Sequence, residues 1–308
     1  MRLIFAGTPE FAVPILEAVA AEHEIAAVLT QPDRPKGRAL RLEPTPVKAA
    51  AARLGLPVLQ PARLRDSDIL QALDGLRARA IVVVAYGKIL PPPVLELTPA
   101  GCVNVHPSLL PKYRGPAPIQ RAIAAGETVT GVSIMKLDEG MDTGPVYKQA
   151  EVPIGPDETS GELAGRLNKV AAGLLLEVLR EIEEGTAKPA PQPAEGTIAE
   201  KIEKEETEID WSRTAKQIHD LVRALNPAPG AFTTFQRGRL KVWRTQMYAD
   251  GPTGTAGEIV SVEPALLVAT GSGHLRLLEL QPENKKRMPA ADFVRGYSPA
   301  VGTKLGGD

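Results

Sequence analysis

The first half of the chain alternates short apolar runs with longer amphipathic segments, and this alternation limits the folds it can adopt. The apolar runs are RLIFAG, EIAAVLT, AIVVVAYG and GCVNVH. Between them, residues 9–21 and 47–54 carry apolar side chains at helical spacing. Strands that are apolar on both faces occur in parallel sheets covered by helices on each side. We therefore predict an α/β fold with a Rossmann-like, doubly wound and mostly parallel sheet.

Two strand-like runs and one long helix follow this alternation. TGVSIMK and VYKQAEVPI are joined by a Gly- and Asp-rich loop, which favours an antiparallel pair at the end of the sheet. The helix is predicted to begin at Thr159, in capping-box spacing with Glu162, and to end near Gly185. Its apolar face comprises Leu163, Leu167, Val170, Leu174, Val178 and Ile182.

The 308 residues are long enough for two domains, and the composition changes where the first should end. From Lys188 the chain reads KPAPQPAEGTIAEKIEKEETEID, in which prolines and mixed charges replace the apolar pattern. We predict a first domain over 1–187, which holds the candidate site, a linker over 188–208 and a second domain over 209–308.

The second domain is expected to be rich in β-strands. One short amphipathic helix comes first, with Ile218, Leu221, Val222 and Leu225 on its apolar face. The runs GRLKVWRTQ, GTAGEIVSV and ALLVATGSGHLRLLELQ then read as strands with Gly-rich turns. Such a pattern predicts a small OB-like β-barrel or a sandwich.

Charge and cysteine content narrow the class of protein. Lys and Arg number 36 against 37 Asp and Glu, so a polyanion would have to bind a local basic patch. The single cysteine, Cys102, excludes a disulfide framework and is expected to be a packing residue.

The N-terminal apolar run is interrupted by Gly7, Pro9 and Glu10, so we expect neither a signal peptide nor a membrane span. We therefore expect a cytoplasmic location. His23, His219 and His274 lack metal-ligand spacing, so we expect no metal site.

The candidate site lies at the end of the run GCVNVH. Asn104 and His106 are two residues apart, so in a strand both side chains point to one face. We expect this strand end to lie where the strand order reverses, which is where open α/β sheets bind ligands. Asp142 stands in LDEGMDTGP, whose glycines permit a tight loop that could bring its carboxylate to the imidazole. The alternative is that His106 is a satisfied core histidine and Asn104 a turn former.

Asparagine, histidine and aspartate together suit a reaction in which the substrate supplies the nucleophile. An amine that attacks an acyl carbon must lose a proton, its oxyanion must be held, and the leaving nitrogen must be protonated. Ser108 invites a Ser-His-Asp reading, but no Gly-x-Ser-x-Gly turn is present, so we predict a turn serine. FAGTPEF offers one glycine where a dinucleotide-binding loop needs three, and no Walker loop exists.

These residues resemble the signatures of the 10-formyltetrahydrofolate-dependent formyltransferases. NVHPSLLPKYRGPAPIQ is similar to that family's Asn-x-His and Ser-Leu-Leu-Pro-x-x-Arg-Gly motifs, and LDEGMDTGP to its aspartate motif. The resemblance implies that Asn104, His106 and Asp142 are catalytic. It also implies a folate site, formed by Leu109, Leu110, Pro111, Lys112, Tyr86, Gly87 and Ile89.

Two further stretches resemble those members of the family that act on an aminoacyl-tRNA. TQPDRPKGRALRLEPTPVK is similar to a loop that reaches the tRNA acceptor end, which implies tRNA contacts by Lys36, Arg38 and Arg41. These cations stand among prolines and Gly37 without apolar anchors, which favours an unpacked positive finger. The stretch from EKEETEIDW to ALNPAPGAF resembles the start of the family's C-terminal domain. More basic residues there could extend the positive track: Arg237, Arg239, Lys241, Arg244, Lys285, Lys286 and Arg287.

The resemblance implies transfer of the formyl group of 10-formyltetrahydrofolate to the α-amine of initiator methionyl-tRNA. We expect a monomer that uses folate as co-substrate and no metal. Alternative functions are N-formylation of an amino-sugar nucleotide or of glycinamide ribonucleotide, hydrolysis of the formylated folate, and a non-enzymatic RNA-binding module. The last would leave the three polar residues without a purpose, and aromatic residues at 4% give few platforms for base stacking.

Overall fold

The structure, a computed structural model, describes residues 1–36 and 41–306. The chain forms two compact units that do not follow chain order. Unit 1 contains 1–115, 130–152 and 164–198, and unit 2 contains 116–129, 153–163 and 199–308. The predicted linker is thus divided, with 188–198 in unit 1 and 199–208 in unit 2. The division into domains at 187 and 209 stays a prediction.

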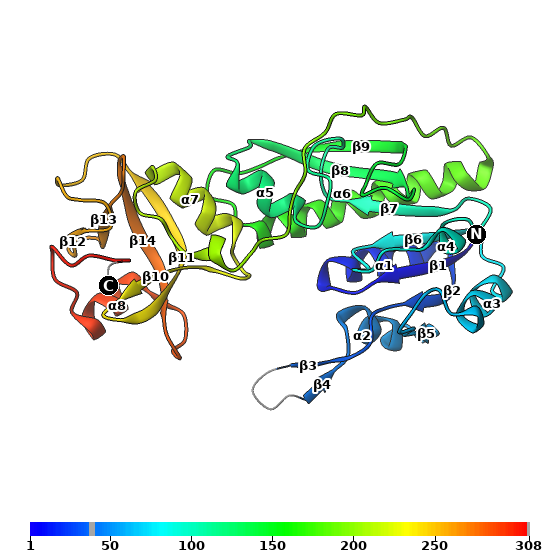
Figure 1. Cartoon of the computed structure of the whole chain (residues 1–308), viewed down its shortest axis with the longest axis horizontal. Helices are drawn as coiled ribbons and strands as arrows, with labels where there is room; N and C mark the ends of the chain where they lie inside the picture. The colour runs from blue at the N-terminus through cyan, green and yellow to red at the C-terminus, as the bar shows by residue number, and fades with distance from the viewer. Residues whose placement is uncertain (37–40, 307–308) are drawn as a thin grey trace. The chain divides into compact units, whose positions relative to one another are not determined.

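A seven-stranded sheet forms the centre of unit 1 (Figure 1). Its order is β5-β2-β1-β6-β7-β8-β9. The strands are β1 (Arg2–Gly7), β2 (Glu24–Leu29), β5 (Val58–Leu59), β6 (Ala80–Val84), β7 (Cys102–His106), β8 (Val129–Lys136) and β9 (Val146–Pro153). β5, β2, β1, β6 and β7 run parallel, and β8 is antiparallel to β7. The predicted fold class is confirmed.

The strand order reverses between β1 and β6, because β2 and β5 lie on one side of β1 and β6 and β7 on the other. The prediction that it reverses at the end of β7 was wrong by one strand. β7 lies one strand from the reversal point because β6 pairs with β1, and β7 pairs with the other edge of β6. The carboxyl end of β7 is still one strand from the reversal point, on the edge where ligands bind in such sheets.

Helices accompany this sheet, and several were not predicted. They are η1 (Glu10–Ala12), α1 (Val13–Glu22), α2 (Pro46–Arg53), α3 (Ser67–Gly75), α4 (Pro92–Leu95) and α6 (Ser160–Glu184). α3 buries only Leu73 fully, and α4 opens with Pro92 and Pro93, so neither has a clear apolar period. The core around the sheet includes Ile4, Leu29, Ile81, Val83, Tyr86 and Cys102. Burial raises the pKa of Cys102 to about 12, and its Sγ lies 3.5 Å from the Val94 carbonyl, as expected of a packing thiol.

The long helix α6 begins and ends as predicted. The Thr159 N–H donates to Glu162 Oε2 at 2.8 Å, and the Glu162 N–H donates to Thr159 Oγ1 at 3.3 Å, which completes a capping box. The Thr159 hydrogen bond, followed by that from Arg244, lowers the pKa of Glu162 to about 2. The helix stops before Gly185, whose φ of +73° is the left-handed conformation typical of a helix C-terminus.

In the basic loop after β2, residues 34–36 and 41–43 form a two-stranded hairpin, and the middle of the predicted finger, 37–40, lies outside the described residues. β3 (Arg34–Lys36) pairs antiparallel with β4 (Arg41–Glu43), and the hairpin extends away from the sheet (Figure 1). Asp33 at its base accepts hydrogen bonds from Lys48 at 2.6 Å and from Gln60 at 2.7 Å. These bonds fix the hairpin's first strand where the sequence offered no apolar anchor.

Unit 2 contains a mostly antiparallel sheet with the order β10-β11-β14-β13-β12, to which β15 adds beside β14. Its strands are β10 (Ala231–Phe235), β11 (Gly238–Tyr248), β12 (Ile259–Ser261), β13 (Leu267–Ala269), β14 (His274–Pro282) and β15 (Met288–Pro289). Its helices are α5 (Pro118–Ala124), η2 (Glu205–Thr207), α7 (Ala215–Ala224) and α8 (Ala290–Tyr297). One core joins α7 and α8 to the sheet through residues such as Ile218, Val222, Val242, Leu277 and Phe293. The expected strand-rich second domain is confirmed as an antiparallel sheet, and β10 and β12 lie at the two ends of its strand order.

Within the part of the chain that the structure describes, no helix is both long enough and apolar enough to cross a membrane.

Candidate active site

β7 places Asn104 and His106 in the interior of unit 1. Its pairing with β6 sets Asn104 opposite Val83, and its pairing with β8 sets His106 opposite Ser133. Asn104 is 8% exposed and His106 4% exposed. The two side chains share one face of the strand, as the spacing predicts.

The Asn104 residue is 8% exposed, and its side-chain amide makes no hydrogen bond among residues 1–36 and 41–306. The amide atoms are not among the buried side-chain atoms that lack a partner, so a small ligand can reach them. An amide that is accessible and free to bind a substrate oxygen fits the predicted role, and a turn former does not, because Asn104 lies inside β7.

Both ring nitrogens of His106 face an acceptor. Nε2 donates to the Tyr113 carbonyl at 2.8 Å, and Nδ1 lies 3.5 Å from Oδ2 of Asp142. Burial lowers the pKa of His106 below its ordinary value, while Asp142 and the Tyr113 carbonyl oppose that change. Burial therefore favours the neutral imidazole, while the facing carboxylate favours the protonated one.

Asp142 is held from both its side chain and its backbone. Oδ2 accepts the Gly115 N–H at 2.8 Å, and the carbonyl accepts Nε2 of Gln192 at 2.9 Å. The residue adopts a φ of +55°, which non-glycine residues seldom do outside functional sites and turns. Oδ1 makes no hydrogen bond within the described residues, so one carboxylate oxygen stays available to a ligand. The structure thus brings Asp142 to His106, which shares β7 with Asn104.

The loop after β7 is fixed by buried serines. Ser108 Oγ donates to the Lys112 carbonyl at 2.6 Å, which confirms the turn serine and leaves no triad with His106. Ser133 Oγ donates to the Ser108 carbonyl at 2.6 Å and accepts the Leu110 N–H at 3.1 Å. Gln149 Nε2 donates to the Leu110 carbonyl and to Ser133 Oγ, both at 2.8 Å. The sequence reasoning missed Ser133 and Gln149, because alternating strand residues give no sign of which loop they bind.

The predicted folate residues have unequal access to a ligand. Leu110 is buried, Leu109 and Pro111 are half-buried, and Lys112 is exposed. Ile89 is 91% exposed, which is unusual for a large apolar side chain.

Tyr86 and Gly87 differ in what they could offer a ligand. Tyr86 is 1% exposed within the core, its hydroxyl has no partner among the described residues, and its carbonyl accepts Thr8 Oγ1 at 2.8 Å. Gly87 has a φ of +78°, and a Cβ there would lie 2.5 Å from Nε2 of Gln31. That amide donates to the carbonyls of Tyr86 and Gly87 at 3.0 and 2.9 Å, which fixes the loop after β6.

Two of the three predicted tRNA residues, Lys36 and Arg41, lie on the hairpin β3–β4. The backbones of Lys36 and Arg41 pair with each other, and Arg38 lies outside the described residues. Beside the hairpin is a cleft of about 510 Å³ at the carboxyl ends of β1 and β2. Its lining is Thr8, Glu10, Val13, Gln31, Pro32, Pro35, Glu43, Pro44, Thr45, Pro46, Ala49, Ala50 and Arg53.

In unit 2, cationic side chains stack on aromatic rings of the sheet. Arg287 lies 3.5 Å and Lys241 5.1 Å from the Trp243 ring, and Arg239 lies 3.8 Å from the Phe232 ring. Burial, followed by the charges of Arg239 and Arg287, lowers the pKa of Lys241. Crowded cations with aromatic faces suit a polyanion that also carries planar bases. This cationic–aromatic cluster contains three of the basic residues predicted to extend the positive track.

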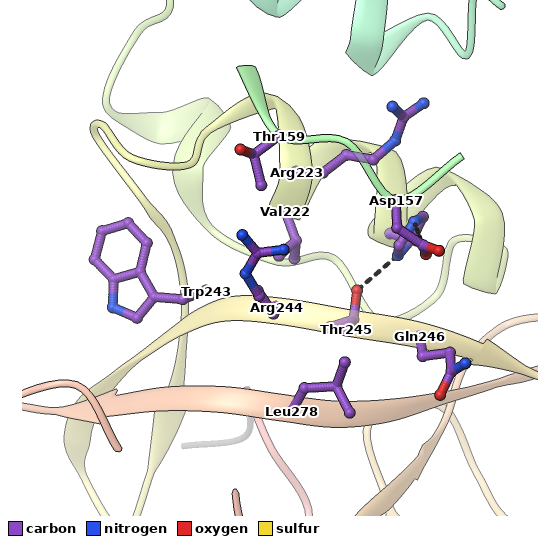
Figure 2. Close-up of a pocket in the computed structure, with 10 residues that line it drawn as sticks. Asp157, Thr159, Val222, Arg223, Trp243, Arg244, Thr245, Gln246 and Leu278 are labelled. Carbon is purple, nitrogen blue, oxygen red and sulfur yellow. Dashed lines mark hydrogen bonds and ion pairs between the residues drawn. The ribbon is translucent and has the colours of Figure 1, made fainter. Parts of the chain in front are cut away.

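A smaller cavity of about 190 Å³ also lies in unit 2, and Figure 2 shows its lining of Arg244 and Thr245 from β11 and Leu278 from β14. Its charged groups already have partners. Arg244 pairs with Glu162 at 2.5 Å, and Arg223 pairs with Asp220 at 2.8 Å. Thr245 Oγ1 lies 2.9 Å from His219 Nδ1. The two arginines of the cavity are therefore paired, and Oδ1 of Asp157 lies 3.4 Å from Nε2 of His219.

Two residues of unit 1, the buried Arg114 and the half-buried Gln192, support the site, although neither was assigned a role from the sequence. Arg114 is 7% exposed, and its Nη2 donates to Oε1 of Gln192 at 2.9 Å. Gln192 in turn binds the backbone of the Asp142 loop. Arg114 is part of the motif NVHPSLLPKYRGPAPIQ, but Gln192 lies in a Pro-rich run with no periodic signal. No three His, Cys, Asp or Glu side chains of the described residues are grouped so that they could hold a metal ion.

Comparison with known proteins identifies the family of the chain. The family described as formyl transferase matches residues 1–179, and the formyl transferase C-terminal domain matches 201–298. A methionyl-tRNA formyltransferase of Symbiobacterium thermophilum is 49% identical over 99% of this chain and 95% of its own length. One of Thermus thermophilus is 47% identical over 99% of both chains.

Solved structures share the fold at lower sequence identity. Methionyl-tRNA formyltransferase from Clostridium thermocellum aligns with a TM-score of 0.57 at 20% identity, over 80% of this chain and 94% of that one. A sugar 3N-formyl transferase aligns with a TM-score of 0.67 at 18% identity, over 93% of this chain and 99% of that one. The family matches cover both parts of the sequence, and the sequence relatives cover nearly all of it. The chain belongs to the formyl transferase family.

Proposed function

We propose that the chain transfers the formyl group of 10-formyltetrahydrofolate to the α-amine of methionyl initiator tRNA. Relatives named methionyl-tRNA formyltransferase that are 47 to 49% identical over 99% of the chain support this acceptor. The sugar formyltransferases share the fold at 18% identity, which supports no choice of acceptor. The observation that carries the chemistry is the His106–Asp142 pair on the strand that also presents the unpaired Asn104 amide.

In the proposed reaction the amine nitrogen forms a bond to the formyl carbon, and the bond from that carbon to N10 of the folate breaks. One proton leaves the amine and one proton is gained by N10, so the exchange needs no oxidant, reductant or further reactant. The formyl oxygen carries negative charge in the tetrahedral intermediate. The protein must therefore supply a hydrogen-bond donor for that oxygen and a route for the proton.

Asn104 is the proposed donor to the oxyanion. Its amide needs no rearrangement to accept a new partner, because it has none among the described residues. A preorganised donor in a buried site stabilises developing charge more than a donor exposed to water does. Its position on β7, a central strand, limits its movement.

The His106–Asp142 pair is the proposed proton carrier. Oδ1 of Asp142 is available to the attacking amine, and His106 lies behind Oδ2. A proton taken from the amine is shared with the imidazole, which becomes an imidazolium held by the carboxylate and by the Tyr113 carbonyl. Opposing effects on the pKa of His106 suit a group that must gain a proton and release it to N10.

The proposed substrate contacts lie at the edges of this site. We assign folate to a set of residues on the loops that follow β6 and β7: Leu109, Leu110, Pro111, Lys112, Tyr86, Gly87 and Ile89. The exposed Ile89 side chain and the φ of Gly87 support this assignment, because a ligand would cover the first and approach the second closely. The cleft beside the hairpin is lined by Pro, Ala and Val side chains as well as polar and charged ones, and we assign it the aminoacyl end of the tRNA. Lys36, Arg38, Arg41 and the cationic–aromatic cluster are assigned to the tRNA phosphates and bases.

The test is a formyl-transfer assay with labelled 10-formyltetrahydrofolate and several acceptors. Label should move to methionyl-tRNA, and not to free methionine or to nucleotide-linked amino sugars. Arg38→Ala should weaken transfer to the tRNA. Efficient transfer to an amino sugar would establish the alternative acceptor, and release of formate without any acceptor would indicate hydrolysis.

A further inference from the structure

Residues 190–198 lie along the loop that follows β7, although they belong to the segment predicted to be a linker. Arg114 forms a parallel bridge with Ile198, and its N–H donates to the Thr197 carbonyl at 2.8 Å. The Thr197 N–H donates to the Pro111 carbonyl at 3.2 Å. A Cβ on Gly196 would lie 2.5 Å from that same carbonyl, so the two segments are in close contact.

Within this segment, Gln192 binds the loop that carries Asp142. Its Nε2 donates to the carbonyl of Asp142 at 2.9 Å and to that of Gly144 at 2.7 Å. Its Oε1 accepts from Nη2 and Nε of Arg114 at 2.9 and 3.2 Å. One amide thus joins the backbone of the Asp142 loop to a buried guanidinium beside Gly115, whose N–H binds Oδ2 of Asp142.

Thr197 binds Tyr113, whose carbonyl accepts a hydrogen bond from Nε2 of His106. Its Oγ1 accepts the Tyr113 N–H at 2.7 Å. The Tyr113 carbonyl accepts His106 Nε2 at 2.8 Å, and Tyr113 has a φ of +60°, so its peptide orientation depends on such restraints. The two groups that face His106 are therefore both connected to 190–198.

We propose that residues 190–198 form a clamp that sets both partners of His106, with Gln192 and Thr197 as positioning residues for formyl transfer. The inference rests on the proposed function, since it assigns to His106 a part in that reaction. Gln192 positions Asp142, which faces Nδ1 of the imidazole, and Thr197 positions Tyr113, whose carbonyl faces Nε2. Neither residue contacts the imidazole itself, so each acts through Asp142 or Tyr113.

Gln192→Glu separates positioning from folding. The glutamate still accepts both bonds from Arg114, but it cannot donate to the carbonyls of Asp142 and Gly144. We expect kcat to fall by about ten- to a hundredfold, as for other small displacements of catalytic groups, with KM for both substrates unchanged. Thr197→Val should act in the same direction, and Thr197→Ser, which keeps the hydroxyl, should restore activity. Glu195→Gln, on an exposed side chain of the same segment, is the matched control and should behave as the wild type.

A second measurement follows His106 directly, without any acceptor. The chain has four histidines, so the His106 ring signals in a nuclear magnetic resonance titration can be assigned by their loss in His106→Asn. Asp142 is the charged group that faces His106 within the described residues. Gln192→Glu should therefore move the His106 titration to lower pH, because the carboxylate that favours the imidazolium is less well placed.

The outcomes are distinct. A lower kcat together with a shifted His106 titration supports the clamp. An unchanged titration in both Gln192→Glu and Thr197→Val overturns it, whether activity falls through unfolding or stays normal. If the titration shifts but the wild type does not formylate methionyl-tRNA, the clamp stands and the proposed function fails.

Discussion

Oδ2 of Asp142 receives the Gly115 N–H at 2.8 Å and also faces Nδ1 of His106 at 3.5 Å, so one oxygen fixes the carboxylate while the other remains open. Asp142→Asn should keep an acceptor for Gly115 but remove the charge that faces the imidazole. We expect kcat to fall by about 10² to 10⁴, the usual range for loss of proton-transfer catalysis. The acidic limb of the rate–pH profile should move to lower pH, because the variant lacks the carboxylate that raises the pKa of His106. A rate–pH profile of methionyl-tRNA formylation checks both.

Asn104→Ala should separate catalysis from folding. The amide makes no hydrogen bond among the described residues, so its removal breaks none, and Tm should change little. Loss of an oxyanion donor should lower kcat by about 10² to 10³. Single-turnover rates with saturating substrates, together with thermal unfolding, measure the two effects. Near-normal turnover would remove Asn104 from the mechanism.

Stability should decrease in mildly acidic solution through His106. Burial lowers its pKa in the folded chain, so below the ordinary value of about 6.5 the unfolded chain binds more protons than the folded one. The free energy of unfolding is therefore fully present above that pH and declines as the pH falls toward the folded pKa. His23 acts in the same direction, so the comparison must be with His106→Asn. Urea unfolding at several pH values should show a shallower decline in that variant, and an identical decline would contradict the lowered pKa.

Ser133→Ala should damage the loop that we assign to folate. Its hydroxyl is fully buried and binds the Ser108 carbonyl, the Leu110 N–H and the Gln149 amide. Leaving such groups unpaired destabilises a protein by about 1 to 3 kcal/mol. KM for the folate should rise more than KM for the tRNA, because the loop 108–112 moves. Equal changes in both constants would argue against a local effect.

The cationic–aromatic cluster should contribute to tRNA affinity in a salt-dependent way. Arg287 lies over Trp243, close to Lys241, and Arg287→Gln removes one cation while the ring remains. KM for the tRNA should rise with kcat unchanged, and the slope of log affinity against log salt should decrease by about one. Glu195→Gln again serves as the control, and an unaltered slope would place the tRNA elsewhere.

Much of the fold could be predicted from local patterns. The runs that became β1, β2, β6 and β7 are apolar on both faces, and Thr159 with Glu162 marks the start of α6, because these features depend on neighbouring residues. The strand order could not be predicted in detail, because it depends on which strand β6 pairs with on its return. The hairpin β3–β4 was missed because its base is fixed by Asp33, Lys48 and Gln60, which are distant in sequence.

The residues of the candidate site that stand in motifs could be predicted. The residues that support the site from other parts of the chain could not. Asn104, His106 and Asp142 could be named from spacing and a family resemblance. Gln192 could not, because a glutamine in a Pro-rich run gives no signal of the carbonyls it binds. Nor could the net pKa of His106 be predicted, since an aspartate nearby indicates a raised pKa while the burial that lowers it appears only in three dimensions.

The buried guanidinium of Arg114 has a consequence for exchanging halves between relatives. Its acceptors, Gln192, Pro193 and Ala194, all lie beyond the end of α6. A chimaera joined at Gly185 would combine Arg114 with residues 190–198 of another relative. The guanidinium would then lose its acceptors unless that relative carried equivalent ones. A crossover after residue 198 transfers the arginine and its acceptors together, and should yield hybrids that keep an intact catalytic centre.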